Sequence, residues 1–190
     1  MNRLHRWYCK TGHWKRAVTD EILPWALDGI ALGEAVLEIG PGHGLTTDWL
    51  RQRVKALDCL EIDEALADSL RDRFVESNVM VQHGDASAMP YADHRFTAVL
   101  SFTMLHHIRT AELQNKFFRE ARRVLQPGGV IAGVDSLPSI LMSIFHIGDT
   151  LTLVAPDTLP GRLTSAGFVD ARVQVGEDRF RFFGMRPDLI

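Results

Sequence analysis

A short glycine-rich turn carries the clearest chemistry in this sequence. Gly40, Gly42 and Gly44 alternate directly after a mostly apolar run at residues 36–39, and a segment of helical character follows. Glycine has no Cβ, so such a turn reaches unusual backbone angles and lets a ligand approach the backbone. A glycine turn between a strand and a helix is typical of nucleotide-type pockets. The spacing is G-x-G-x-G, with Leu45 where a dinucleotide site has its third glycine, which disfavours an NAD-linked oxidoreductase.

Acidic residues end the next two expected strands. Glu61 lies about 20 residues after the first glycine, where a carboxylate can bind both hydroxyls of a ribose. The alternative is that Glu61 or Asp63 only caps the following helix, a role that suits Asp63 better. Asp85 could accept a hydrogen bond from an adenine amino group, or it could form a local turn with its own backbone. Together with the glycines, these residues predict a ligand site at the carboxyl edge of an open α/β sheet.

The elements that must position these residues follow from the hydrophobic periodicity. Strands and helices alternate from residue 35 onward, which favours an α/β fold with a mostly parallel sheet and helices on both faces. The tail differs, because two short alternating runs flank Gly176-Glu177-Asp178, a hairpin signal. We therefore expect a C-terminal antiparallel pair on the sheet. The expected strands are 35–39, 56–62, 79–83, 96–102, 130–134, 169–175 and 179–183, and the expected helices are 43–54, 63–76 and 111–125, the last ended by Pro127-Gly128-Gly129.

A single domain over residues 1–190 is expected from the length and composition. The 46% hydrophobic content is enough for a sizeable core. We divide it into a helical arm at 1–34, a cofactor-binding core at 35–135, an apolar substrate-covering segment at 136–156, and a C-terminal helix and hairpin at 157–190. The basic residues among the first sixteen could face a substrate or an anionic surface, or they could form a solvated helix face.

Charge and cysteine usage exclude several classes. The net charge of −3 gives no electrostatic case for nucleic-acid binding. No apolar run reaches the roughly 18 residues of a membrane span, and no secretory signal is evident, so a cytoplasmic setting is expected. Neither the two cysteines nor the eight histidines have metal-ligand spacing, so no metal is expected. Cys59 suits a buried small hydrophobe.

The combined motifs resemble those of class I S-adenosylmethionine-dependent methyltransferases. The similarity spans about residues 35–134, and it is closest to the small-molecule branch that includes the ubiquinone/menaquinone-biosynthesis methyltransferases. It rests on VLEIGPGHG, LEID, HGDASAMPYADHRFTAVLS, MLHHI and RVLQPGG. The resemblance implies a Rossmann-like seven-stranded sheet whose last strand is antiparallel. It also implies S-adenosylmethionine as cofactor and S-adenosylhomocysteine as product.

The resemblance also implies cofactor-binding roles for individual residues. The three glycines would border the methionine and ribose parts, and Glu61 would bind the ribose hydroxyls. Ile62 would pack on adenine. The other implied positions are Glu38 at the amino-acid end, Asp85 and Ala86 at the adenine edge, and Ser101 beside the methionine moiety.

The sulfonium of this cofactor already activates the methyl group, so the protein must mainly align the reactants in a dry site. A base is needed only for a nucleophile that starts protonated. His106 and His107 follow the fourth expected strand, and His106 is the better candidate base. The alternative is that one of them orders the loop.

The acceptor is expected to be small and apolar or aromatic. Residues 136–156 are rich in Leu, Ile, Met and Phe, and such a segment normally covers something apolar. Tyr8, His107, Met142 and Phe145 are the expected substrate-pocket residues. The segment could instead form a homodimer interface or an ordinary packed helix, and the aromatic arm could either close over the cofactor or dock its apolar face on the domain.

A non-catalytic S-adenosylmethionine-binding module or sensor is the competing function. The binding positions read as intact, which favours catalysis. A nucleic-acid methyltransferase is disfavoured by the net charge and by the lack of a reader domain.

Overall fold

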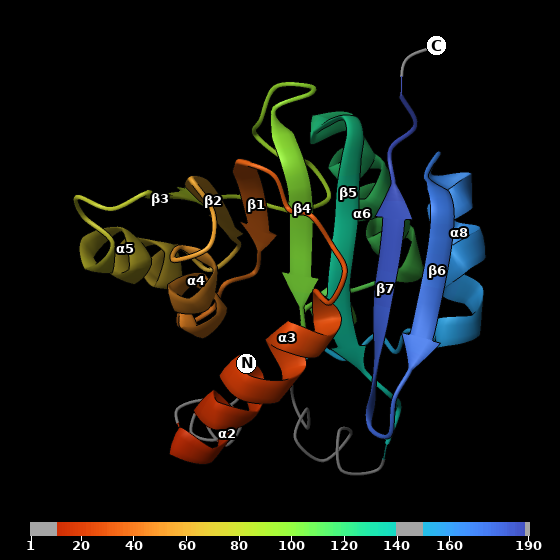
Figure 1. The fold of residues 1–190 in the computed structure, drawn as a ribbon, viewed down its shortest axis with the longest axis horizontal. Coiled ribbons are helices and arrows are strands. Elements are labelled where there is room, and N and C mark those ends of the chain that lie inside the picture. Colours follow the sequence, from red (N-terminus) through yellow and green to blue (C-terminus); the bar gives the residue numbers. More distant parts are fainter. Residues whose placement is uncertain (1–10, 140–149, 189–190) are drawn as a thin grey trace.

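The computed structural model describes residues 11–139 and 150–188 of the chain. Its centre is a seven-stranded sheet with the strand order β3-β2-β1-β4-β5-β7-β6 (Figure 1). Strands β1 to β5 pair with one another in parallel, whereas β7 runs antiparallel to both β5 and β6. The predicted fold class is therefore confirmed. The strands are β1 (Ala35–Ile39), β2 (Ala56–Glu61), β3 (Val79–His83), β4 (Phe96–Phe102), β5 (Leu125–Ser136), β6 (Val169–Val175) and β7 (Arg179–Met185).

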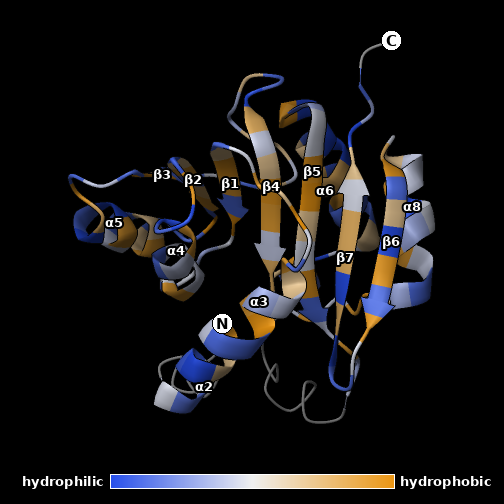
Figure 2. Ribbon diagram, in the orientation of Figure 1, coloured by the Kyte–Doolittle hydropathy of each residue, from blue (hydrophilic) through white to orange (hydrophobic). Residues whose placement is uncertain are grey.

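Helices cover both faces of this sheet (Figure 1). The helices α6 (Ala111–Val124) and α8 (Leu159–Ser165) pack on one face, and α4 (Leu45–Leu50) and α5 (Glu64–Arg73) pack on the other. Because parallel strands that are buried on both faces need apolar residues throughout, β4 and β5 are largely hydrophobic in Figure 2.

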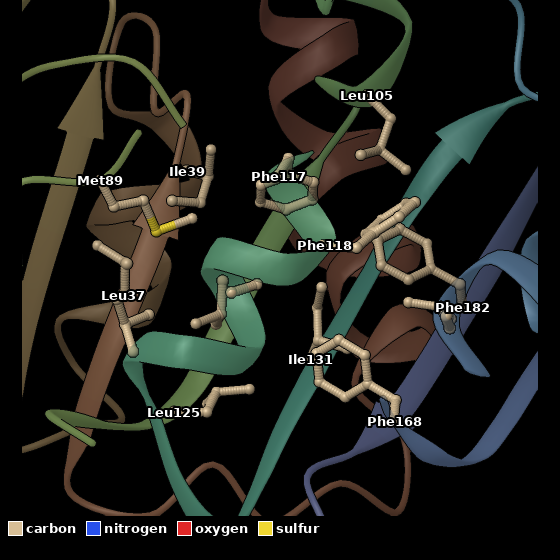
Figure 3. Close-up of a cluster of buried hydrophobic side chains, with 14 of the residues drawn as sticks. Leu37, Ile39, Met89, Leu105, Phe117, Phe118, Leu125, Ile131, Phe168 and Phe182 are labelled. Atoms are coloured by element: carbon tan, nitrogen blue, oxygen red, sulfur yellow. The ribbon is translucent and has the colours of Figure 1, made fainter. Parts of the chain in front are cut away.

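The core on the α6 side contains most of the large aromatic residues. Figure 3 shows Phe117 and Phe118 projecting from α6 over the sheet, with Phe118 beside Phe182 of β7. All three side chains are at most 1% exposed. This close packing fixes α6 on the sheet and thereby holds the β4–α6 connection, which includes the 3₁₀ turn η2 (Leu105–His107).

The described part of the N-terminal arm, which was expected to be helical over 1–34, is helical over 12–26. It comprises α2 (Gly12–Arg16), the π-helical segment η1 (Ala17–Ile22) and α3 (Leu23–Ala26), and Thr11 caps its start by accepting the N–H of Trp14. Its apolar side packs into the core opposite α6, where Leu23 and Ala26 are fully buried. The described part of the arm thus docks its apolar face on the sheet, while the basic Lys15 and Arg16 stay exposed.

The boundaries differ most from prediction in two elements. The helix expected at 43–54 is shorter, since Gly44 has left-handed angles and α4 begins only after it. The strand expected at 130–134 extends from Leu125 to Ser136, so Pro127-Gly128-Gly129 lies inside β5 rather than before it. Leu125 is already extended at the end of α6, and the backbones of Gly128 and Gly129 pair with Arg186 beyond β7. The glycines therefore form an irregular strand start instead of a loop.

Candidate functional site

The glycine turn joins β1 to α4 at the carboxyl edge of the sheet. Gly40, Gly42 and Gly44 have φ angles of 66°, 57° and 77°, a region that L side chains adopt only with strain. The N–H of Gly40 donates to the carbonyl of Leu60 at 2.9 Å, which ties the turn to β2. All three glycines are therefore required by the backbone, as the sequence predicted.

The space around the three glycines separates their roles. A Cβ on Gly40 would lie 2.5 Å from Cγ of Met104, and one on Gly44 would lie 2.7 Å from Leu70, so these two glycines allow close packing within the protein. A Cβ on Gly42 would meet nothing within 4 Å. The middle glycine thus leaves a cradle that faces open space, where a bound molecule could contact the backbone.

Glu61 lies directly beside this cradle, at the end of β2. Its side chain is only 5% exposed, and its two oxygens accept the N–H groups of Gly42 (2.9 Å) and Asp63 (3.1 Å). A carboxylate oxygen has two lone pairs, so each oxygen retains capacity for a ligand hydroxyl. Asp63 caps α5 by accepting the N–H of Leu66 at 3.1 Å. Asp63 is therefore the cap, as predicted, and ribose binding by Glu61 stays a prediction.

The next residue, Ile62, is a large apolar side chain that is 67% exposed. An exposed isoleucine next to a nearly buried carboxylate matches the two parts of a nucleoside, a flat apolar base and a ribose diol. The backbone of Ile62 is fixed from the adjacent strand, because its carbonyl lies 3.1 Å from Nε2 of His83.

Glu38 is buried one strand away, with 1% of its side chain exposed. Its carboxylate accepts the hydroxyls of Thr46 and Thr47, the latter at 2.6 Å, and the thiol of Cys59 at 3.5 Å. Burial raises the pKa of the Glu38 carboxyl above its ordinary value, the charge of Glu61 adds to this, and the three hydrogen bonds oppose it. Glu38 thus anchors the first turn of α4 to β1, and a contact with a cofactor remains a prediction.

Cys59 behaves as the sequence suggested. Its side chain is fully buried, and burial raises the pKa of the thiol well above its ordinary value. A thiol in this state is a poor nucleophile, so Cys59 has a packing role.

Asp85 follows β3 and is exposed. Its Oδ1 accepts the N–H of Ser87 at 2.7 Å, which is the local turn weighed as the alternative. That turn holds the backbone of Ala86 at the same edge of the sheet as Glu61. A contact of Asp85 and Ala86 with an adenine edge stays a prediction.

Ser101 lies near the end of β4, opposite Ile39 and Gly133 in the neighbouring strands. It is fully buried, and its hydroxyl has no hydrogen-bond partner within the described part of the chain. A buried hydroxyl without a partner is costly, so a ligand group at this position would relieve the cost.

The histidines after β4 have unequal surroundings. His106 is 3% exposed, and its Nδ1 lies 2.5 Å from Oδ1 of Asp135 at the end of β5. His107 is half-buried, and its ring centroid lies 4.2 Å from that of His106. Sequence reasoning did not single out Asp135, and only the pairing of β4 with β5 brings it to His106.

The expected substrate-pocket residues Tyr8, Met142 and Phe145 lie outside the described residues. Of the apolar segment at 136–156, Leu137 and Val154 pack against the α6-side core, and Leu153 is 48% exposed. In residues 11–139 and 150–188, no three His, Cys, Asp or Glu side chains are placed to hold a metal ion. No helix in the same ranges is both long and apolar enough to cross a membrane.

Taken together, the cradle at Gly42, the carboxylate of Glu61, the exposed Ile62 and the orphaned hydroxyl of Ser101 fit a nucleoside cofactor such as S-adenosylmethionine. All four lie at or near the carboxyl ends of β1, β2 and β4. The order of these strands reverses between β1 and β4, and open α/β sheets bind ligands at such a switch point.

Comparison with known proteins agrees with this geometry. The profile of a methyltransferase domain matches residues 37–133. A probable S-adenosylmethionine-dependent methyltransferase of Mycolicibacterium smegmatis is 33% identical over 98 residues, covering 52% of this chain and 36% of that protein. The ubiquinone/menaquinone biosynthesis C-methyltransferase of Idiomarina loihiensis is 32% identical over 123 residues, covering 61% and 45%. The chain therefore spans less than half the length of these relatives.

Two further matches bear on the breadth of the similarity. Ribosomal RNA small subunit methyltransferase A of Fusobacterium nucleatum is 44% identical, but over only 57 residues, covering 29% of this chain and 22% of that protein. A chain from the complex between the Haloferax volcanii Trm112 methyltransferase activator and a methyltransferase superimposes with a TM-score of 0.73 at 15% identity. That match covers 98% of this chain and 99% of the other, and it supports the fold.

Proposed function

The chain belongs to the methyltransferase-domain family, and we propose that it transfers the methyl group of S-adenosylmethionine to a small apolar or aromatic acceptor. The observation that carries this proposal is the open cradle at Gly42 beside the carboxylate of Glu61. A packed protein edge would fill such a space, whereas a nucleoside cofactor needs both the bare backbone and the acidic partner.

The residues at the carboxyl edge have distinct roles in this proposal. Glu61 accepts the ribose hydroxyls through its remaining lone pairs, and Ile62 packs against the adenine ring. Asp85 and Ala86 bind the adenine edge. The hydroxyl of Ser101 and the turn anchored by Glu38 border the methionine part of the cofactor.

S-adenosylmethionine, when bound, supplies a methyl group that is already activated by its sulfonium. The chain therefore needs only to hold the acceptor in line and to keep water out, which can lower the barrier by several kcal/mol. The rigid sheet provides the alignment, since Ser101 and Glu38 are both buried in it. His106 is our candidate for the group that accepts a proton from the acceptor.

Two observations favour a small acceptor. The similarity to the quinone methyltransferase covers 123 residues, whereas the similarity to the ribosomal RNA methyltransferase covers 57. In addition, the net charge is −3, and a nucleic-acid substrate would favour a basic surface. The apolar segment at 136–156 would cover the acceptor. A cofactor-binding module without catalysis is the weaker alternative, because His106 and Asp135 form a buried histidine–carboxylate pair that binding alone would not require.

A pair of asparagine substitutions tests the cofactor site. Asn tolerates left-handed backbone angles, and both Gly42 (φ 57°) and Gly29 (φ 73°) have open space where a Cβ would lie. We expect Gly42→Asn to weaken S-adenosylhomocysteine binding at least roughly tenfold by calorimetry, because the new side chain fills the cradle. Gly29→Asn is the matched control and should bind like the wild type. Equal binding by all three proteins would contradict the proposed site.

A further inference from the structure

The side chain of Asp135 is fully buried, at the carboxyl end of β5. Its carboxylate accepts three N–H groups. Oδ1 faces Nδ1 of His106 at 2.5 Å and the backbone N–H of Ser136 at 2.7 Å, and Oδ2 accepts the backbone N–H of His106 at 3.1 Å. Asp135 therefore holds both the backbone and the ring of one histidine.

A buried carboxylate is costly unless it is fully hydrogen-bonded. Two of its three donors are backbone N–H groups, which any acceptor could satisfy. The third is an imidazole nitrogen, and a carboxylate is an acceptor only, so Nδ1 must carry the proton of this hydrogen bond. The ring nitrogen that can then take up a proton is Nε2.

The position of this pair connects it to the cradle. Residue pairing places Phe102 opposite Val134, so Asp135 continues β5 at the level where β4 turns into η2. Thr103 in this turn has φ 50°, a strained conformation for a residue with a Cβ. Met104 follows and packs its side chain onto Gly40, and His106 lies two residues further on.

We infer that Asp135 is a positioning residue that fixes His106 in the Nδ1–H tautomer, so that Nε2 serves as the base for an acceptor whose nucleophilic atom carries a proton. The inference rests on the proposed methyl transfer. It narrows the acceptor class to compounds that must lose a proton to become nucleophilic, such as a hydroquinone, in which loss of a hydroxyl proton activates the oxygen or the neighbouring ring carbon. Acceptors that are already ionised, such as a fatty-acid carboxylate, need no such base.

The proton balance of the step is simple. As the acceptor atom forms its bond to the methyl carbon, the bond between that carbon and sulfur breaks, and its electron pair stays with S-adenosylhomocysteine, the leaving group. The proton that the acceptor gives up passes to Nε2 of His106. The ring becomes an imidazolium, and the charge of Asp135 stabilises it through the Nδ1–H bond. The proton is returned to solvent when the product leaves. His107, whose ring centroid lies 4.2 Å from that of His106, is a titratable neighbour of the ring.

The experiment uses His106→Asn and Asp135→Asn in the full chain. An Asn amide can take the place of Nδ1–H toward Asp135, so His106→Asn keeps the hydrogen bond and removes only the base. We expect it to bind S-adenosylhomocysteine within about twofold of the wild type and to lose at least roughly 100-fold in methylation of a prenylated 1,4-naphthohydroquinone under anaerobic conditions. Decanoate, which is already ionised, is the second acceptor offered to the wild type.

Imidazole ¹⁵N NMR gives a readout that does not depend on the acceptor. At pH 8 the His106 ring should show the Nδ1–H tautomer in the wild type and a shifted tautomer balance in Asp135→Asn. An Nε2–H ring in the wild type, or a His106→Asn enzyme that methylates the hydroquinone at the wild-type rate, would overturn the inference. A wild type that binds S-adenosylhomocysteine but methylates decanoate alone would overturn the acceptor class. A protein that binds no S-adenosylhomocysteine would instead refute the proposed function.

Discussion

Two neighbouring parts of the same sheet edge each hold a buried carboxylate, but the partners differ. At the β1–β2 edge (residues 40–44 and 61–63), Glu61 accepts the backbone N–H groups of Gly42 and Asp63. At the β4–β5 edge (residues 103–107 and 135–136), Asp135 is hydrogen-bonded to the ring Nδ1 of His106 and accepts two backbone N–H groups. The first arrangement leaves carboxylate lone pairs for a ligand, whereas the second orients a histidine ring through its Nδ1.

The difference indicates a division of labour between binding and proton transfer. A cofactor shared by many enzymes can be held by backbone and one carboxylate, which depend little on neighbouring side chains. A proton acceptor depends on the side chains around it. At the β4–β5 edge, the pairing of the two strands brings the carboxylate of Asp135 to His106. The two edges should therefore respond differently to substitution.

The largest expected effect concerns packing at the β4–β5 edge. A Cβ on Gly133 would lie 2.0 Å from the backbone oxygen of Ser101 and 2.8 Å from Phe182, and neither can move freely in the sheet. We expect Gly133→Ala to lower the free energy of unfolding by about 3 kcal/mol, measured by urea denaturation. Gly161→Ala in α8 is the control, since a Cβ there meets nothing within 4 Å. It should raise stability by up to about 1 kcal/mol.

A Gly133→Ala protein as stable as the wild type would mean that β4 and β5 can separate at this point. The register that brings Asp135 to His106 would then be less firmly fixed than the structure indicates.

The second effect concerns the carboxylate of the β1–β2 edge. Glu61→Gln keeps the shape of the side chain but removes its charge, so hydrogen bonds to ribose hydroxyls should weaken by about 2 kcal/mol. This corresponds to roughly 30-fold weaker S-adenosylhomocysteine binding in calorimetry. Asp135→Asn should leave that affinity nearly unchanged. If both substitutions weakened binding equally, the proposed separation between the two edges would be wrong.

The two edges also differ in how far the sequence could predict them. Three alternating glycines in residues 40–44 predict left-handed backbone angles at those positions. Glu61 follows after one helix and one strand, at a spacing that the fold class sets. The mostly parallel seven-stranded sheet and its antiparallel tail followed from periodicity and from the resemblance. These features are local or recur throughout a fold class, so they could be predicted from sequence patterns.

Asp135 could not be found in this way. It lies 29 positions from His106 in the chain, and nothing in the residues around it marks its partner. The expected strand ended at residue 134, two positions before the observed end of β5 at Ser136, so Asp135 was left outside it. Whether Asp85 forms a local turn was likewise undecidable, since Asp suits both roles until Ser87 is placed.

A third effect tests whether the helix cap at the β1–β2 edge is separate from the ligand site. Asp63 caps α5 through Leu66, and Thr110 caps α6 through Leu113 at 3.2 Å. Replacing either residue by Ala should cost about 1 kcal/mol of unfolding free energy, measured by thermal or urea denaturation. Asp63→Ala should change S-adenosylhomocysteine affinity far less than Glu61→Gln. A comparable loss of affinity would show that Asp63, and not only Glu61, contacts the ribose.

The smallest expected effect is a pH-dependent one at Glu38, the second buried carboxylate of the β1–β2 edge. Burial raises its pKa in the folded state, so the folded protein binds this proton more tightly than the unfolded chain does. The resulting stabilisation is present below the ordinary glutamate range and is lost as the pH rises through the raised pKa. Glu38→Gln cannot titrate, so its stability relative to the wild type should improve as the pH rises from about 4 and should level off above the raised pKa, as measured by thermal unfolding. A constant gap between Glu38→Gln and the wild type over this range would mean that the hydroxyls of Thr46 and Thr47 compensate fully for the burial of the charge.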